Sequence, residues 1–158
     1  MLLPRRGPER PSSAASCGAL RKGPDMHDAS PATLDDRVRA FLTTFSRDTD
    51  PAAVGETFAD PFLLADATGA RPVPRAAFLA ALPGREHAFR DAGLGTPVLT
   101  RIDCQRLDET YVLARGDWDA PRTQGRKPVR LASSFLLHDD GDAFRVVLYL
   151  NHQGLPTA

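Results

Sequence analysis

One stretch of the chain carries an acidic side chain in a local sequence that could place it at the mouth of a pocket. The run Phe58–Asp66 contains an Asp-Pro step, continues through four apolar positions and ends in a carboxylate shortly before Gly69. These features predict a strand that delivers Asp66 to a glycine turn. A carboxylate held there could act as a general base that takes a proton next to a carbonyl group. The alternative is a turn residue whose carboxylate accepts a hydrogen bond from its own backbone.

The other residue types that often do chemistry are not spaced as a metal or nucleophilic site. The four histidines lack a ligand spacing such as i, i+4, so we predict no metal, and we also predict no cofactor. Cys17 and Cys104 have no CxxC neighbour, which favours free thiols in a reducing, cytoplasmic compartment. We interpret Cys104 as a small buried apolar residue rather than a nucleophile.

Charge and hydropathy argue against nucleic-acid and membrane partners. The 158 residues carry 20 basic and 20 acidic side chains; residues 1–25 hold five basic and two acidic ones, which leaves a net charge of −3 on the rest. A slightly acidic domain without a basic stripe is poorly suited to contact phosphates. No apolar run approaches the roughly 20 residues that span a bilayer. We therefore expect neither nucleic acid nor a membrane as a partner.

The N-terminal segment is predicted to lie outside the folded domain. Residues 1–29 are rich in proline, serine and arginine, and they contain no continuous apolar stretch of signal-peptide length. Either this segment is a disordered tail, or translation starts at Met26. The remaining residues, 30–155, have a length that suits one globular domain.

Hydrophobic periodicity predicts three helices in the first half of the domain. The first starts at Ser30-Pro31 or at Thr33, where a capping box is possible. A shorter second helix follows Asp50-Pro51. A third starts at Pro74 and stops at Pro83-Gly84, and residues 85–95 can add a further helical turn. The apolar stripe of the first helix consists of Leu34, Val38, Phe41, Leu42 and Phe45.

The second half of the chain changes to the period of strands. Two long hairpins are expected, one from residues 98–106 and 111–119 and one from residues 129–138 and 143–151. Helices followed by antiparallel strands indicate an α+β fold, with the helices packed on one face of a curved sheet.

These elements resemble the nuclear-transport-factor-2-like (NTF2-like) superfamily, which includes ketosteroid isomerases and polyketide-cyclase-like (SnoaL-like) proteins. The resemblance covers about residues 33–152 and rests on the first helix, on Phe58-Ala59-Asp60 with Asp66 and Gly69 downstream, and on the terminal hairpins. It implies a cone, in which a strongly curved, mainly antiparallel sheet wraps the three helices and leaves a pocket at its open end. It also implies a homodimer through the open face of the sheet.

The resemblance assigns isomerase roles to some positions and not to others. Asp66 falls at the position of the general base, eight residues after Phe58, with Gly69 in place three residues later. The two oxyanion positions fall at Phe41 or Leu42 and near Ser134. The former cannot donate a hydrogen bond, and a hydroxyl is a weak substitute for the protonated acid that holds an enolate. Steroid-type isomerisation is therefore not expected.

Strand alternation extends this assignment to a whole pocket. If Ser134 faces the cone, Leu136 and His138 do so as well, and the partner strand contributes Val147, Tyr149 and Asn151. Trp118 then closes the rim, and Phe41, Phe45 and Phe62 form the floor. Asp66, His138 and Tyr149 would be the acid–base set. The alternatives are a solvent-exposed strand end for His138 and core packing for Tyr149 and Trp118.

Two classes of function follow from this pocket. In the first, the domain binds a small hydrophobic molecule without chemistry and pairs as a homodimer through a sheet face that carries Leu99, Leu113, Leu131 and Leu137. In the alternative, it is an isomerase, cyclase or hydrolase-type enzyme that uses Asp66 as general base on a small carbonyl compound. The missing oxyanion donors favour the first class, and Asp66 favours the second.

Overall fold

The described part of the protein forms one α+β unit. The computed structural model describes residues 32–47, 50–123 and 125–152. It contains the helices α1 (Leu34–Arg47), α2 (Pro51–Gly55) and α3 (Arg75–Asp91). The strands are β1 (Phe58–Asp66), β2 (Gly69–Val73), β3 (Val98–Arg106), β4 (Tyr111–Ala120), β5 (Val129–Asp139) and β6 (Phe144–Asn151). The tail predicted for residues 1–29 lies outside the described residues.

Local capping signals set the starts of the first two helices, as predicted. Thr33 Oγ1 accepts a hydrogen bond from the N–H of Asp36, and the Asp36 carboxylate accepts one from the N–H of Thr33. This reciprocal pair is the capping box expected at Thr33. Asp50 caps α2 by accepting from the N–H of Ala52 at 3.0 Å, with Pro51 in the first turn.

Helix α3 is longer than the sequence predicts. It continues through Pro83-Gly84 to Asp91, so the predicted stop at that pair is wrong. A proline has a helical φ and removes one backbone hydrogen bond, so the helix can continue where packing compensates. Phe78, Leu79 and Leu82 supply this packing on the core. Gly93 follows the end of the helix, where a φ of 66° suits glycine and its N–H donates to the carbonyl of Arg90.

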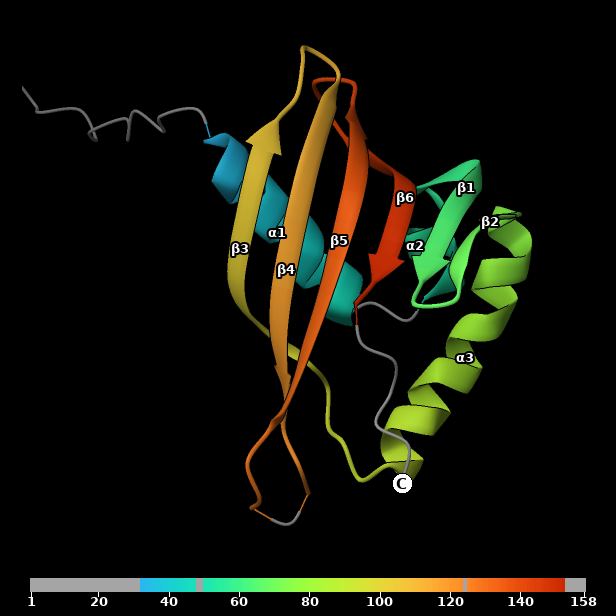
Figure 1. Cartoon of the computed structure of the whole chain (residues 1–158), viewed down its shortest axis with the longest axis vertical. Coiled ribbons are helices and arrows are strands. Elements are labelled where there is room, and N and C mark those ends of the chain that lie inside the picture. The colour runs from blue at the N-terminus through green and yellow to red at the C-terminus, as the bar shows by residue number, and fades with distance from the viewer. Residues whose placement is uncertain (1–31, 48–49, 124, 153–158) are drawn as a thin grey trace, which may run out of the picture. The chain divides into compact units, whose positions relative to one another are not determined.

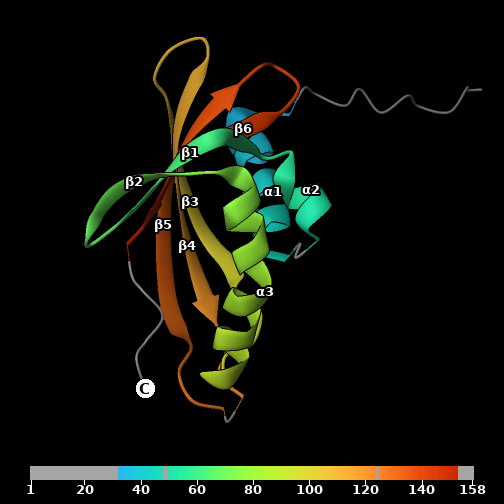
Figure 2. The same cartoon turned by 90° about the vertical axis from the view of Figure 1, so that its right-hand side faces the viewer.

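The strands form one mixed sheet with the helices on one face. The strand order is β2-β1-β6-β5-β4-β3; β1 and β6 are parallel, and the other neighbours are antiparallel. Figures 1 and 2 show α1, α2 and α3 together on the same side of this sheet. The α+β prediction is confirmed. The sheet is not strongly curled, which corrects the expected cone; its central strands β4 and β5 pair through ten consecutive residue pairs without a register shift.

Strand alternation puts the predicted pocket residues of β5 on the wrong face. Phe135 and Leu137 are fully buried under the helices, and Ser133 and Asp139 share their face. Ser134, Leu136 and His138 therefore point away from the helices, because neighbouring side chains of a strand alternate. The same register corrects the expected leucine face. Leu137 lies in the core, and Leu99 and Leu131 pack against that core. Of the four leucines, only Leu113 lies on the helix-free face.

The core between helices and sheet is largely aromatic. Phe58 contacts the rings of Phe62 and Phe78, with centroids 4.7 and 4.8 Å apart. Phe135 stacks on Tyr149 at 5.0 Å, and both contact Phe45 edge-on. These contacts fix the inner face of β5 and β6, on which the candidate site is built.

A buried carboxylate joins the far end of the sheet to α1. Asp139, whose side chain is 3% exposed, accepts hydrogen bonds from Arg37 and Arg106, each at 2.7 Å. Its Oδ1 also accepts from the N–H of Gly141. Because both guanidinium groups favour the charged carboxylate, they hold the pKa of Asp139 far below its usual value. This clamp fixes α1 on the sheet.

Candidate functional site

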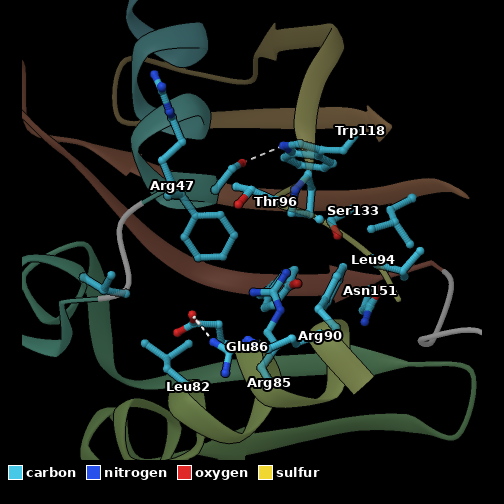
Figure 3. Close-up of a pocket in the computed structure, with 18 of the residues that line it drawn as sticks. Arg47, Leu82, Arg85, Glu86, Arg90, Leu94, Thr96, Trp118, Ser133 and Asn151 are labelled. Carbon is cyan, nitrogen blue, oxygen red and sulfur yellow. Dashed lines mark hydrogen bonds and ion pairs between the residues drawn. The ribbon is translucent and has the colours of Figure 1, made fainter. Parts of the chain in front are cut away.

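A cavity of about 770 Å³ lies between α3 and the helix-facing side of the sheet. Figure 3 shows it with Arg85, Glu86 and Arg90 rising from α3 on one side and Trp118, Thr96 and Ser133 on the other. The end of α1 and the segment Leu94–Pro97 complete its wall. The apolar lining consists of Phe45, Val54, Leu64, Phe78, Leu82, Phe89, Leu94, Pro97, Trp118, Leu131 and Tyr149.

The indole of Trp118 is a fixed part of this wall. Its Nε1–H donates to Ser46 Oγ at 2.6 Å, and the Ser46 hydroxyl donates in turn to the carbonyl of Leu42. The ring lies across Gly116, where a Cβ would clash with it. Trp118 is 5% exposed. The hydrogen-bond chain satisfies the polar atom of the indole and leaves its apolar body to the cavity.

Two residues that line the cavity carry hydroxyl groups without a partner among the described residues. Ser133 is 7% exposed and Tyr149 is 5% exposed, and both line the cavity. Neither hydroxyl makes a hydrogen bond to a described residue, yet no side-chain oxygen in the described part is fully buried and unsatisfied. Each hydroxyl oxygen therefore keeps some exposed surface. Buried polar groups normally have partners, so this pair is available to a molecule that enters.

The charged lining comes mainly from the second half of α3. Glu86 and Arg90 form an ion pair at 2.8 Å. The Arg85 guanidinium lies 5.9 Å from the ring centroid of Phe45 and 5.7 Å from that of Phe89. Sequence reasoning missed these residues, because it stopped the helix at Pro83-Gly84 and allowed residues 85–95 only a further helical turn. On a helix that continues past Pro83, Leu82, Arg85 and Phe89 have the spacing i, i+3, i+7 and share one face. This spacing could have predicted the lining.

The structure brings together four of the predicted site residues. Phe45, Trp118, Tyr149 and Asn151 line the cavity. Phe41 and Phe62 do not line it: Phe41 packs on Phe144, and Phe62 lies in the core between Phe58 and Phe78.

The remaining pocket residues predicted on β5 and β6 also lie away from the cavity. Ser134 Oγ lies 2.8 Å from His152 Nε2, and His138 packs on Tyr111, both on the helix-free face. Leu136 shares that face. Val147 sits at the register shift between β5 and β6 and does not line the cavity. On β5 the expected strand alternation was out of step by one residue, whereas on β6 the register shift displaces Val147 from the face of Tyr149 and Asn151.

Asp66 has the structure of a turn residue. Its Oδ1 accepts from the N–H of Thr68 at 2.8 Å and from the Thr68 hydroxyl, and Arg71 lies 3.4 Å from Oδ2. The hydrogen bonds from Thr68 lower the pKa of Asp66, whereas a pocket that strips water from it would raise that pKa. Asp66 does not line the cavity and is not grouped with His138 or Tyr149. The expected acid–base set is not assembled.

Two further properties limit the kinds of site present. Among residues 32–47, 50–123 and 125–152, no three His, Cys, Asp or Glu side chains form a group that could hold a metal ion. The helices in this same part of the chain are too short or too polar to cross a membrane.

Comparisons with known proteins agree on the fold. A family model described as NTF2-like protein (DUF6841) matches residues 30–154. No curated protein shows significant sequence similarity to the chain. Similar solved structures include a protein of unknown function with a cystatin-like fold from Nostoc punctiforme, which is 12% identical with a TM-score of 0.58, over 78% of this chain and 96% of that one.

Two other solved structures carry functional terms in their names. A putative ketosteroid isomerase from Parabacteroides distasonis is 11% identical with a TM-score of 0.57, over 78% of this chain and 90% of that one. A protein with a ketosteroid isomerase-like fold from Catenulispora acidiphila, in complex with trimethylamine, is 18% identical with a TM-score of 0.51, over 78% and 88%. At these identities the likeness shows the fold alone.

Proposed function

The chain belongs to the NTF2-like family DUF6841, and from that premise we propose that it binds a small, largely apolar organic molecule in the cavity beneath α3. The observation that carries this proposal is the pair of nearly buried residues Ser133 and Tyr149, which line the cavity beside its apolar residues and whose hydroxyls have no partner among the described residues. A cavity of about 770 Å³ has the size of small-molecule sites, which range over roughly 300–1,000 Å³. An apolar wall with a few convergent polar groups is their usual composition. The trimethylamine complex of the Catenulispora protein adds support, because the same fold there holds a small organic molecule.

The alternative, an acid–base enzyme with Asp66 as general base, is less well supported. A base must reach the proton that it removes. The Asp66 carboxylate is occupied by Thr68 and Arg71, and it lies outside the cavity lining. We therefore favour binding over catalysis.

Trp118 offers a direct test of the proposal, because it is the single tryptophan of the chain and lines the cavity. Titration with a neutral apolar amide that does not absorb near 290 nm, such as 4-cyclohexylbutanamide, should change the Trp118 emission saturably. Ser133→Phe fills the cavity and should abolish the change. Ser134→Phe, one residue along on the opposite face of β5, is the matched control and should retain it. An emission change that persists in Ser133→Phe would place the binding elsewhere and contradict the proposal.

We also propose a homodimer through the helix-free face of the sheet. Leu63, Leu148, Leu136 and Leu113 are direct cross-strand neighbours in β1, β6, β5 and β4, and they form one row across that face. We call them the leucine row. Leu63 is 40% exposed and Leu113 is 43% exposed. A contiguous apolar strip of this kind suits a self-complementary contact with a second copy.

Sedimentation velocity tests the dimer. The wild-type chain should sediment as a dimer at tens of micromolar, and Leu136→Glu should give a monomer because it puts a charge in the middle of the leucine row. Leu107→Glu is the control, since Leu107 is 51% exposed in the turn between β3 and β4 and lies outside the row. A wild-type monomer at these concentrations would contradict the dimer.

A further inference from the structure

The charges around the cavity are unbalanced. Three arginines, Arg47, Arg85 and Arg90, line it together with a single carboxylate, that of Glu86. The lining therefore carries a net charge of +2. Glu86 is already paired with Arg90 at 2.8 Å, so it does not neutralise the other two cations. A cavity with this charge attracts anions and repels amines.

Arg85 is the cation best placed to bind a ligand. It has no carboxylate within ion-pair distance among the described residues. Its guanidinium lies near the rings of Phe45 and Phe89, which are themselves part of the cavity wall. Contact with ring faces stabilises the cation and uses none of its five N–H donors. The planar fork of those donors matches a carboxylate, which it can hold with two parallel hydrogen bonds.

The cavity also supplies a surface for an apolar body, partly on α3 and partly on the wall across from it. Phe78, Leu82, Leu94 and Trp118 form this surface. A molecule that filled the cavity would thus meet apolar walls over most of its surface and a guanidinium group at α3.

From these contacts we propose that the ligand is an amphipathic organic anion, a compact apolar molecule with a carboxylate head group that Arg85 binds. The inference rests on the proposed function, because it names the ligand class of the same cavity. It distinguishes this chain from the Catenulispora protein, whose structure holds an amine.

Three probes that share one apolar body test the inference. They are 4-cyclohexylbutanoate, its amide 4-cyclohexylbutanamide and the amine 4-cyclohexylbutylammonium, followed by Trp118 emission and by calorimetry at pH 7. The acid should bind about tenfold more tightly than the amide, which corresponds to roughly 1.4 kcal/mol, and the amine should bind most weakly. Added salt should weaken the binding of the acid and leave the affinity for the amide unchanged.

Substitution of Arg85 separates the charge from the cavity. Arg85→Gln should lower the affinity for the acid to that for the amide, and it should leave the affinity for the amide unchanged. Arg85→Lys, which keeps the charge and loses the fork, should give an intermediate affinity for the acid. Arg39→Gln, an exposed position on α1 outside the lining, is the control and should behave as wild type. Thermal melting of each variant checks that it is folded, and the salt dependence of the wild type provides a test that needs no variant.

The outcomes separate this inference from the proposed function. Equal affinities for acid and amide, or equal weakening of both by Arg85→Gln, would overturn the anion inference and leave the cavity as a binding site. The tightest binding by the amine would do the same. Failure of all three probes to bind would contradict the proposed function and overturn the anion inference with it.

Discussion

Gly116 lies directly beneath the indole of Trp118. A Cβ at Gly116 would come within 2.8 Å of both Cζ2 and Cζ3 of the ring, closer than side chains pack. The glycine therefore allows the indole to lie flat across β4, where it reaches Ser46 and forms the cavity wall.

Gly116→Ala should displace the Trp118 ring and break its hydrogen bond to Ser46. We expect a loss of about 1–3 kcal/mol in the free energy of unfolding, as for an overpacked core, together with a shift in tryptophan emission. Urea unfolding followed by fluorescence and circular dichroism measures both. Gly84→Ala is the matched control: it lies inside α3 with nothing within 4 Å of the added Cβ, so it should stabilise the protein by roughly 0.5–1 kcal/mol. Equal effects of the two substitutions would contradict the role of Gly116.

Asp139→Asn should destabilise the protein, because two arginines lose the charge that they bind. We expect the free energy of unfolding to fall by about 1.5–3 kcal/mol, the range for hydrogen bonds to charged groups. The pKa of Asp139 is lowered in the folded state, so its stabilisation is complete above the usual pKa of about 3.8 and is lost as the pH falls below that value. Urea unfolding between pH 7 and pH 2.5 should show this loss in the wild type. The variant should show a shallower decrease, and an identical pH profile would contradict the assignment.

Cys104 should react slowly with alkylating reagents in the folded protein. The pKa of this thiol is raised to about 11, first by burial and then by the Asp35 carboxylate, which accepts a hydrogen bond from Sγ at 2.9 Å. Very little thiolate is then present at pH 8, and the thiolate is the reactive form. Peptide mapping after iodoacetamide treatment distinguishes Cys104 from Cys17. Asp35→Asn should accelerate the reaction of Cys104, and unfolding should accelerate it further. Rapid alkylation of the native wild type would refute the expectation.

Asp66→Asn should lower the melting temperature slightly and leave binding in the cavity unchanged. The substitution weakens the acceptor for the N–H and hydroxyl of Thr68, and the residue lies outside the lining. The pair of measurements is melting and the Trp118 response to 4-cyclohexylbutanoate. Loss of the ligand response with unchanged melting would restore Asp66 as a functional residue.

The elements that the sequence predicted well are those set by neighbouring residues. The capping box at Thr33 and the cap at Asp50 are local, and so is the helical stripe that buries Val38 and Leu42. The extension of α3 past Pro83 could not be predicted in the same way, because packing on the core compensates a local helix breaker.

The register of β5 failed for a different physical reason. Its inward face carries Ser133 and Asp139 beside the apolar residues, and its outward face includes Leu136. Leu131, Phe135 and Leu137 still mark the inward face, but the prediction was anchored on Ser134, which the resemblance placed at an oxyanion position facing the cone. Asp139 is buried through its two arginine partners, one of which lies 102 residues away in the chain. Such long-range pairing has no local signal.

The charged lining residues of α3 lie apart from the contacts that hold the fold together. α3 has no fully buried residue, and its first turn is anchored by Arg75, which bonds the carbonyls of Gly55 and Phe58. Arg85, Glu86 and Arg90 come after Pro83, on turns whose loss of charge leaves the aromatic core intact. Substitutions at these three positions can change the charge of the cavity lining while the packing of the core is retained. The charge of the cavity can therefore be varied on these turns with little effect on the stability of the domain.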